Sequence, residues 1–249
     1  MSIYTKFAII GAGGVGGTVV DELLKKGASV TILTRDDSKE ELHAFKARGA
    51  TLIKVAYDDE VALKKALTGS EVAYLGVRVI EGLNSFKQAA RDLLTELKLP
   101  FTIFYTGVFD EFVSMVLGCN FNEGYMNVVG KGETAFSITP RTDVGRFVAQ
   151  VLATTPKSAL EGAEIAFEAE GLSPLQIRDI AEKKLGKKIE VRHVDYEENK
   201  KKVDTDFMAF LTTLLEDGHS LAGSEQEVKA NVEKFFPDWN PAKYESFVA

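Results

Sequence analysis

Along the first hundred residues, hydrophobic positions come in short continuous runs separated by segments with helical spacing. Runs long enough for a buried strand lie at residues 7–10, 28–33, 50–55, 72–77 and 101–105. Helical segments are predicted between them at residues 15–23, 39–48, 59–67 and 84–97. Continuous apolar runs are typical of parallel strands buried on both faces, and strands that alternate with helices build such sheets. This half of the chain therefore predicts an α/β fold with a parallel, doubly wound sheet.

The pattern changes in the second half of the chain. Two strands at residues 126–129 and 134–138 flank the turn Gly130-Lys131-Gly132-Glu133, which predicts a hairpin. Ser173 with Pro174 is a favourable helix start, and Gly186 is a favourable stop. The later elements are predicted as a helix at 141–152, a strand at 164–167, a helix at 173–185, a strand at 189–194 and a helical tail from about 196 that breaks near 217–218.

A glycine-rich loop joins the first strand to the first helix. The sequence from residue 11 reads Gly11-Ala12-Gly13-Gly14-Val15-Gly16-Gly17. Glycine at a strand-to-helix turn allows unusual backbone angles and the close approach of a pyrophosphate, whose charge the helix N-terminus favours. We therefore expect all seven residues to bind a dinucleotide, together with Gly76 at the carboxyl end of the fourth strand.

Two spacings fit these glycines. Gly11, Gly13 and Gly16 match the common dinucleotide pattern of three glycines. Gly11, Gly14 and Gly17 match the spacing favoured by extended and atypical short-chain dehydrogenases. The sequence leaves both registers open, and a glycine-rich turn without a ligand is the alternative.

The end of the second strand bears on which dinucleotide binds. Arg35 follows the strand directly, and an arginine there can bind a 2′-phosphate, which favours NADP(H). Asp36 and Asp37 come next and keep NAD(H) as an alternative, since an acidic residue binds the ribose hydroxyls. Asp58, after the third strand, is a further candidate for contact with adenine. A simpler interpretation is a solvated turn in which Asp36 or Ser38 caps the next helix.

Composition excludes several classes of protein. The net charge of −7 argues against general affinity for nucleic acid, and no apolar run is long enough to cross a bilayer. The single cysteine, Cys119, excludes an intramolecular disulfide framework, and the three histidines show no metal-ligand spacing. We therefore expect a soluble cytoplasmic or nucleocytoplasmic protein without a metal site. No feature of the sequence points to a particular oligomeric state.

Together these features predict two parts. We expect a Rossmann-like doubly wound domain over residues 1–155, with a hairpin excursion at about 110–138. Residues 156–249 are expected to form a smaller α+β lobe that binds a substrate or a partner. Ligands bind at the carboxyl ends of strands in such sheets, so Tyr105, Gly107 and Phe109, at the end of the fifth strand, are candidate substrate contacts.

The order of these motifs resembles the NmrA-like family. The motifs are the glycine loop, Arg35, the Leu-Pro-Phe-Thr-Ile stretch at 99–103, and the Gly130 turn followed by Asp143-Val144. The family consists of atypical short-chain dehydrogenases and includes NADPH-dependent, isoflavone-reductase-like enzymes and fungal redox-sensing regulators. The resemblance covers most of residues 1–200 and implies a dinucleotide-binding fold.

The resemblance also implies a catalytic candidate and a missing segment. A lysine on the helix before the proline that precedes the next strand acts near the nicotinamide in the reductases, and that position corresponds to Lys87. An exposed helix lysine is the alternative. Family members carry a further helix and strand between the fourth strand and this helix, whereas this chain passes almost directly from Val77 to Lys87. We expect the strand at 101–105 to take the vacant place beside the fourth strand.

Two functions follow as hypotheses. One is an NADPH-dependent reductase that acts on a small aromatic or unsaturated substrate. The other is a non-catalytic redox sensor that binds NADP(H) and acts through a regulatory protein partner. Tyr196 and Lys200 match the spacing of the short-chain dehydrogenase catalytic pair, but they lie far beyond the sheet strands, which favours coincidence.

Overall fold

The computed structural model describes residues 2–75 and 85–248, with the side chains of 75 and 85–90 left out. The described chain folds as two compact units. The first unit comprises Met1–Phe104 and Val144–Ile165, and the second comprises Tyr105–Asp143 and Ala166–Ala249. The segment expected as an excursion from the first domain thus groups with the C-terminal part of the chain.

The first unit is built on a parallel sheet with the strand order β3-β2-β1-β4. In this sheet Ile9 lies beside Ile32 on one side and Tyr74 on the other. Its strands are β1 (Lys6–Ile10), β2 (Ser29–Thr34), β3 (Thr51–Lys54) and β4 (Val72–Leu75). Phe7, Ala8 and Ile9 are fully buried, as their continuous apolar run predicts. The predicted α/β class and parallel sheet are confirmed.

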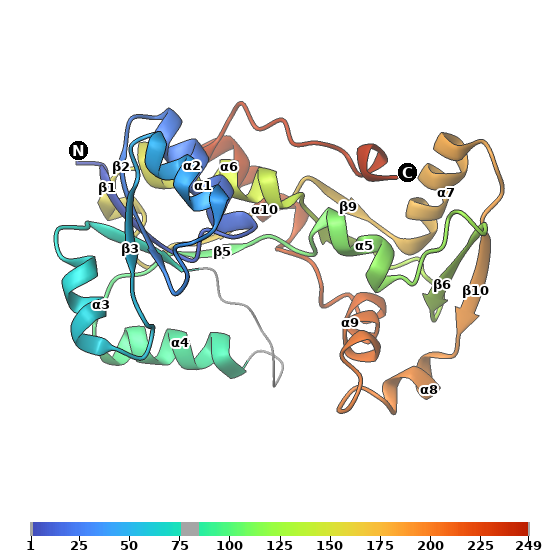
Figure 1. Cartoon of the computed structure of the whole chain (residues 1–249). Coiled ribbons are helices and arrows are strands. Elements are labelled where there is room, and N and C mark those ends of the chain that lie inside the picture. The colour runs from blue at the N-terminus through green and yellow to red at the C-terminus, as the bar shows by residue number, and fades with distance from the viewer. Residues whose placement is uncertain (1, 76–84, 249) are drawn as a thin grey trace. The chain divides into compact units, whose positions relative to one another are not determined.

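Helices follow the strands as the spacing predicts. They are α1 (Val15–Lys25), α2 (Glu40–Ala47), α3 (Glu60–Leu67), α4 (Ser85–Glu96) and α6 (Arg141–Thr154), with a 3₁₀ turn η1 (Lys157–Ala159). Figure 1 shows α1 and α2 beside the sheet, where α1 contacts β1 and β2, and α2 contacts β3. Helix α1 buries Val19, Val20 and Leu23 on one face. A Cβ on Gly145 of α6 would lie 2.4 Å from the Thr18 side chain, so glycine permits their close packing.

The expected position of the fifth strand is wrong. Strand β5 (Ile103–Tyr105) pairs with β8 (Glu164–Ala166), not with β4. The reason is that residues just before β8 accept hydrogen bonds from residues at the start of β5. The N–H of Ile103 donates to the Ala163 carbonyl at 2.9 Å, and the Thr102 hydroxyl donates to the Leu160 carbonyl at 2.6 Å. Within the part of the chain that the structure describes, β1 is the only strand paired with β4.

The second unit contains two small strand pairs. Strand β6 (Tyr125–Val129) pairs in parallel with β10 (Glu190–Val194), as Figure 1 shows. Strand β7 (Phe136–Ile138) pairs antiparallel with β9 (Glu170–Leu172). The unit's helices are α5 (Asp110–Val116), α7 (Pro174–Leu185), α8 (Tyr196–Lys200), α9 (Phe207–Glu216) and α10 (Glu225–Phe235), with a 3₁₀ turn η2 (Tyr244–Phe247).

The predicted hairpin is therefore wrong, although both of its strands exist. The turn that should join them is bound by Glu216, whose carboxylate accepts the N–H groups of Lys131 at 2.8 Å and Gly132 at 3.2 Å. The Gly130 N–H donates at 3.0 Å to the carbonyl of Val194, the last residue of β10. These long-range contacts direct β6 and β7 to different partners.

One apolar cluster holds the second unit together. It combines residues of α5, β6, β7, α7, α9, the adjoining loops and the C-terminal end: Val113, Val116, Leu117, Phe121, Met126, Val128, Phe136, Ile138, Ile177, Ala181, Ile189, Leu215, Tyr244 and Val248. Helix α7 begins with a capping box between Ser173 and Gln176 and ends at Gly186 in the left-handed region, as predicted. No described helix has the length and apolar character to cross a membrane.

Candidate dinucleotide-binding site

The glycine loop spans the turn between β1 and α1. Gly11 has a φ of 85° and Gly14 a φ of 47°, both in the region that L side chains rarely adopt. Gly14 is the N-cap residue of α1, with Val15 the first helical residue. The backbone conformation by itself therefore favours glycine at residues 11 and 14.

The remaining glycines differ in what surrounds them. A Cβ on Gly16 would lie 2.1 Å from the Gly11 carbonyl oxygen, and one on Gly17 would lie 3.0 Å from that of Ala12. Gly13 has an ordinary φ, and a Cβ there would meet nothing within 4 Å. The chain's own packing thus explains Gly16 and Gly17 but not Gly13. In the Gly11, Gly13, Gly16 register the middle glycine is the one that lets a pyrophosphate approach, and the open space at Gly13 fits that role.

The start of α1 carries features that suit an anion. Among the described residues, no side chain caps the helix, and its first turn contains no acidic residue. The Gly16 N–H donates to the Gly13 carbonyl at 3.0 Å. The other N–H groups of this turn and the positive end of the helix dipole are not compensated by a carboxylate of the described residues. Ala12 is buried and Val15 half-buried within the same loop. A pyrophosphate would supply the missing acceptors.

Arg35 stands at the end of β2. Its guanidinium lies over the ring of Tyr57, 5.4 Å from the ring centroid. The Tyr57 hydroxyl donates to the Leu33 carbonyl at 3.1 Å, which fixes the ring against β2. No carboxylate of the described residues pairs with Arg35. The guanidinium is thus positioned by an aromatic face while its N–H donors stay available for an anion.

Both acids of the same turn have partners. Asp36 accepts the Ser38 N–H at 3.0 Å and the Ser38 hydroxyl at 2.7 Å, and these hydrogen bonds lower the pKa of Asp36. Asp37 pairs with Lys54 at 3.1 Å, and the Lys54 ammonium lowers the pKa of Asp37. Neither Asp36 nor Ser38 caps the next helix, because the N-cap of α2 is Lys39 and it makes no side-chain cap.

Three further cofactor and catalytic candidates are Asp58, Gly76 and Lys87. Asp58 lies exposed in the turn between β3 and α3, where the neighbouring Asp59 caps the helix by accepting the Ala62 N–H at 2.9 Å. Gly76 lies outside the described residues. Lys87 lies on α4, and its side chain is outside the described part.

The predicted substrate contacts belong to the second unit. Tyr105 ends β5 and is half-buried. Phe109 is the N-cap residue of α5, and its ring centroid lies 6.0 Å from that of Phe112. A Cβ on Gly107, whose φ is 69°, would lie 2.2 Å from the Ser137 carbonyl oxygen. Close packing within the unit therefore explains Gly107 without a substrate.

Asp110 is a buried acid that no sequence motif singles out. It is 2% exposed, and neither carboxylate oxygen has a hydrogen-bond partner. Burial, together with the smaller effect of the charges of Glu111, Glu170 and Asp143, raises the pKa of Asp110 to about 7. The signal in the sequence is two adjacent acids directly after the apolar pair Val108-Phe109. That signal alone does not distinguish a buried acid from a solvated helix start.

The Tyr196 and Lys200 pair forms an exposed hydrogen-bonded chain on α8. The Lys200 ammonium donates to the Tyr196 hydroxyl at 3.1 Å, and this hydrogen bond raises the pKa of Lys200. The Tyr196 hydroxyl in turn donates to the Asp217 carboxylate at 2.7 Å. The Tyr196 hydroxyl hydrogen is already engaged by Asp217, which agrees with a coincidental match. The described residues contain no group of three or more His, Cys, Asp or Glu side chains that could hold a metal ion.

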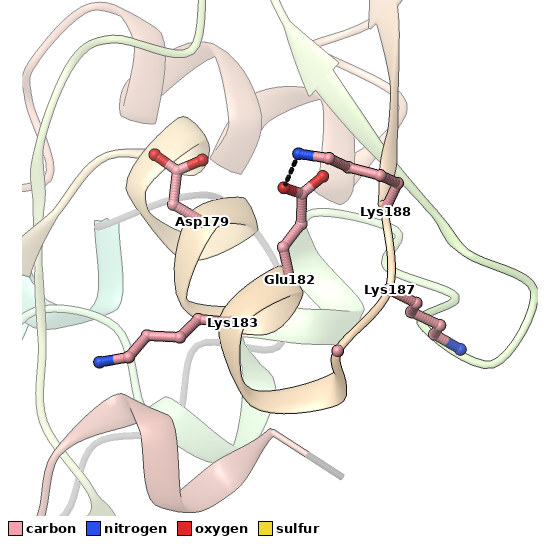
Figure 2. Close-up of a pocket in the computed structure, with 6 residues that line it drawn as sticks. Asp179, Glu182, Lys183, Lys187 and Lys188 are labelled. Atoms are coloured by element: carbon pink, nitrogen blue, oxygen red, sulfur yellow. Dashed lines mark hydrogen bonds and ion pairs between the residues drawn. The ribbon is translucent and has the colours of Figure 1, made fainter.

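An open depression of about 390 Å³ lies at the C-terminal end of α7. Its lining is charged and consists of Asp179, Glu182, Lys183, Gly186, Lys187 and Lys188. Figure 2 shows the ion pair between Glu182 and Lys188, at 2.8 Å, with Lys183 and Lys187 extending away from it. None of the residues predicted to bind a ligand lines this depression.

Solved structures share the fold over nearly the whole chain. An isoflavone reductase aligns with a TM-score of 0.79 and 15% identity, over 98% of each chain. The complex of leucoanthocyanidin reductase with NADPH from Vitis vinifera aligns with a TM-score of 0.79 and 17% identity, over 96% of this chain and 97% of that one. A nucleoside-diphosphate-sugar epimerase from Staphylococcus aureus aligns with a TM-score of 0.74 and 14% identity, over 98% and 99%. At these identities the likeness establishes the Rossmann-like fold.

The sequence model of the NmrA-like family matches residues 5–91 and 83–248. The two matches include the glycine loop, Arg35 and the Gly130 turn on which the resemblance was based. They overlap at residues 83–91, next to the place where the missing segment is expected. The chain belongs to the NmrA-like family.

Proposed function

We propose that this protein binds NADP(H) at the glycine loop and Arg35 and uses it to reduce a small aromatic or unsaturated substrate. The observation that carries the proposal is the arrangement at the end of β2. Arg35 lies on Tyr57 without a carboxylate partner among the described residues, while both neighbouring acids are engaged. This arrangement offers a guanidinium to a 2′-phosphate rather than a carboxylate to a ribose hydroxyl.

The chain's own residues would bind and orient the cofactor. The N–H groups at the start of α1 would bind the pyrophosphate, with Gly13 leaving room for it. Arg35 would bind the 2′-phosphate, and Tyr57 would hold the guanidinium in place. NADPH supplies the hydride when bound. We assign Lys87 the orientation of the nicotinamide ribose or a proton transfer to the reduced substrate, and Tyr105, Gly107 and Phe109 contact with that substrate.

The comparisons support this proposal without fixing the reaction. One neighbour is named as a leucoanthocyanidin reductase in complex with NADPH, which is the cofactor that Arg35 favours here. Another is named as a sugar epimerase, so the same fold carries more than one chemistry. The assignment of a reductase therefore depends on a test of activity.

The binding test uses isothermal titration calorimetry with NADPH, NADP, NADH and NAD on the whole chain. We expect NADPH to bind at least tenfold more tightly than NADH. In Arg35→Ala the affinity for NADPH falls by about 10- to 100-fold, because a hydrogen bond to a charged group contributes roughly 1.5–3 kcal/mol. Arg48→Ala is the matched control, since Arg48 pairs with Asp21 on α1 and should leave both affinities unchanged. Unchanged NADPH affinity in Arg35→Ala contradicts the assignment.

The activity test follows NADPH oxidation at 340 nm with a panel of enones and quinones. Steady turnover that Lys87→Ala lowers without changing NADPH affinity supports the reductase. Tight NADPH binding with no turnover on any substrate favours the second function, a redox-sensing regulator that acts through a protein partner. That alternative is favoured by β4, which lacks a second strand partner among the described residues. A sensor requires unequal affinities for NADPH and NADP, which the same calorimetry measures.

A further inference from the structure

Lys54 joins the turn after β2 to the neighbouring strand. It is the last residue of β3, and in the parallel register it lies beside Thr34, the residue that precedes Arg35 in the sequence. Its ammonium lies 3.1 Å from the Asp37 carboxylate, and the side chain is 63% exposed. The Lys54 side chain is therefore largely exposed, yet it is paired with an acid two residues after Arg35.

The charges around Arg35 make this pair relevant to the cofactor. Within residues 35–37, Arg35 carries one positive charge and Asp36 and Asp37 carry two negative charges. Ser38 binds Asp36 through neutral donors and leaves its charge in place. Lys54 is the cation that pairs with Asp37. Lys39 acts on Asp36, whereas the ion-pair partner of Asp37 is Lys54. Without Lys54, residues 35–37 would have a net charge of −1 and Asp37 would be uncompensated, which disfavours a 2′-phosphate and suits a ribose hydroxyl.

We propose that Lys54 is a positioning residue for cofactor selection, which holds and neutralises Asp37 so that the Arg35 turn favours NADP(H) over NAD(H). This inference rests on the proposed cofactor site. Lys54 acts through Asp37 in this arrangement and does not itself bind the phosphate. Its effect should therefore depend on the presence of the Asp37 carboxylate, which a double-mutant cycle can measure.

The experiment measures NADPH and NADH affinity by calorimetry for Lys54→Gln, Asp37→Asn and the double variant. We expect Lys54→Gln to weaken NADPH binding roughly fivefold and to strengthen NADH binding, the size expected for an exposed charge pair. In the double variant the NADPH affinity should return to within about twofold of the original protein, because no uncompensated acid is left. Raising the salt concentration to 0.5 M should reduce the effect of Lys54→Gln, since exposed charges are screened.

Lys64→Gln is the control, because Lys64 is an exposed lysine that pairs with Glu60 on α3 of the same unit. It should change neither affinity, and thermal unfolding should show that all variants are folded. A double variant that stays as weak as Lys54→Gln would overturn the inference, because Lys54 would then contact the phosphate directly. An unaffected Lys54→Gln alongside a weakened Arg35→Ala would also overturn it and leave the cofactor site standing. An original protein that binds no NADPH would overturn both.

Discussion

At the scale of single residues, Asp110 illustrates how tertiary packing changes the chemistry of a side chain. Its carboxylate is buried next to Glu111, Asp143 and Glu170, and two of these acids hold the C-terminal segment. Asp143 accepts the Ala242 N–H at 2.8 Å, and Glu170 accepts the N–H of Tyr244 at 2.6 Å. The cluster thus places negative charge around an acid that lacks hydrogen bonds of its own.

This cluster predicts a pH dependence of stability. The folded pKa of Asp110 is about 7, above its ordinary value of 3.8. Between these values the unfolded chain has released the proton and the folded chain has kept it, so stability falls as the pH rises from about 4 to 7. The decrease in the free energy of unfolding over this range amounts to at most roughly 4 kcal/mol. Asp110→Asn removes this decrease, because asparagine does not ionise. Urea unfolding at pH 4.5, 6 and 8 measures it.

The matched control for this prediction is Asp204→Asn, which changes an exposed acid of the same unit. It should leave the pH profile as it is in the original protein. If Asp110→Asn and the original protein lose stability in parallel over this range, Asp110 is ionised throughout and the prediction is wrong.

Gly13 supports a second prediction at the residue scale. A Cβ at this position meets no atom of the protein within 4 Å, so Gly13→Ala should change the free energy of unfolding by less than about 1 kcal/mol. The methyl group would enter the space assigned to the pyrophosphate, so the affinity for NADPH should fall more than tenfold. Gly16→Ala is the contrast, because its Cβ would clash with the Gly11 carbonyl and lower stability as well. Wild-type affinity in a folded Gly13→Ala would argue against a pyrophosphate at this loop.

At the scale of elements, Glu216 determines where β6 and β7 go. Its two carboxylate oxygens accept the N–H groups of Lys131 and Gly132. Glu216→Ala should lower the free energy of unfolding by about 1–3 kcal/mol, because two backbone donors of the turn lose a charged acceptor. Glu225→Ala, on the exposed first turn of α10, should change it by less than about 0.5 kcal/mol. Equal effects of the two substitutions in chemical denaturation would show that the turn does not depend on Glu216.

The elements themselves were largely predictable because their signals are local. Ser173 is the N-cap of helix α7 and Pro174 its first residue, and Gly186 ends the helix in the left-handed region. Each of these residue types favours that position in a helix. The pairing of strands was not predictable from such signals. Residues 130–133 look like a hairpin turn in sequence, but Glu216 binds that turn from 84 or more residues away. The short β9 was missed because its sequence, Glu170-Gly171-Leu172, contains a single apolar residue and so lacks the pattern of a strand.

At the scale of the whole chain, the first unit contains the predicted cofactor site, in the turns that follow β1 and β2 of its parallel sheet. A bound dinucleotide should stabilise this unit by mass action, by about 2.7 kcal/mol at a free concentration of 100 times Kd. Hydrogen exchange with and without NADPH should show slower exchange of the amides at 13–17 and 35–38. Amides of α7, in the second unit, serve as the internal reference. Identical exchange at 13–17 under saturating NADPH would place the cofactor elsewhere.

The sequence by itself determined the α/β class, the glycine turn between β1 and α1, the place of Arg35 at the end of β2 and the family. These depend on periodicity, on glycine's backbone freedom and on residues close together in the chain. The tertiary structure decided that β5 pairs with β8, that Asp110 is buried and that Tyr57 and Lys54 meet the turn after β2. The physical reason is that hydrogen-bond partners, burial and charge pairs between distant residues depend on which surfaces the fold brings together.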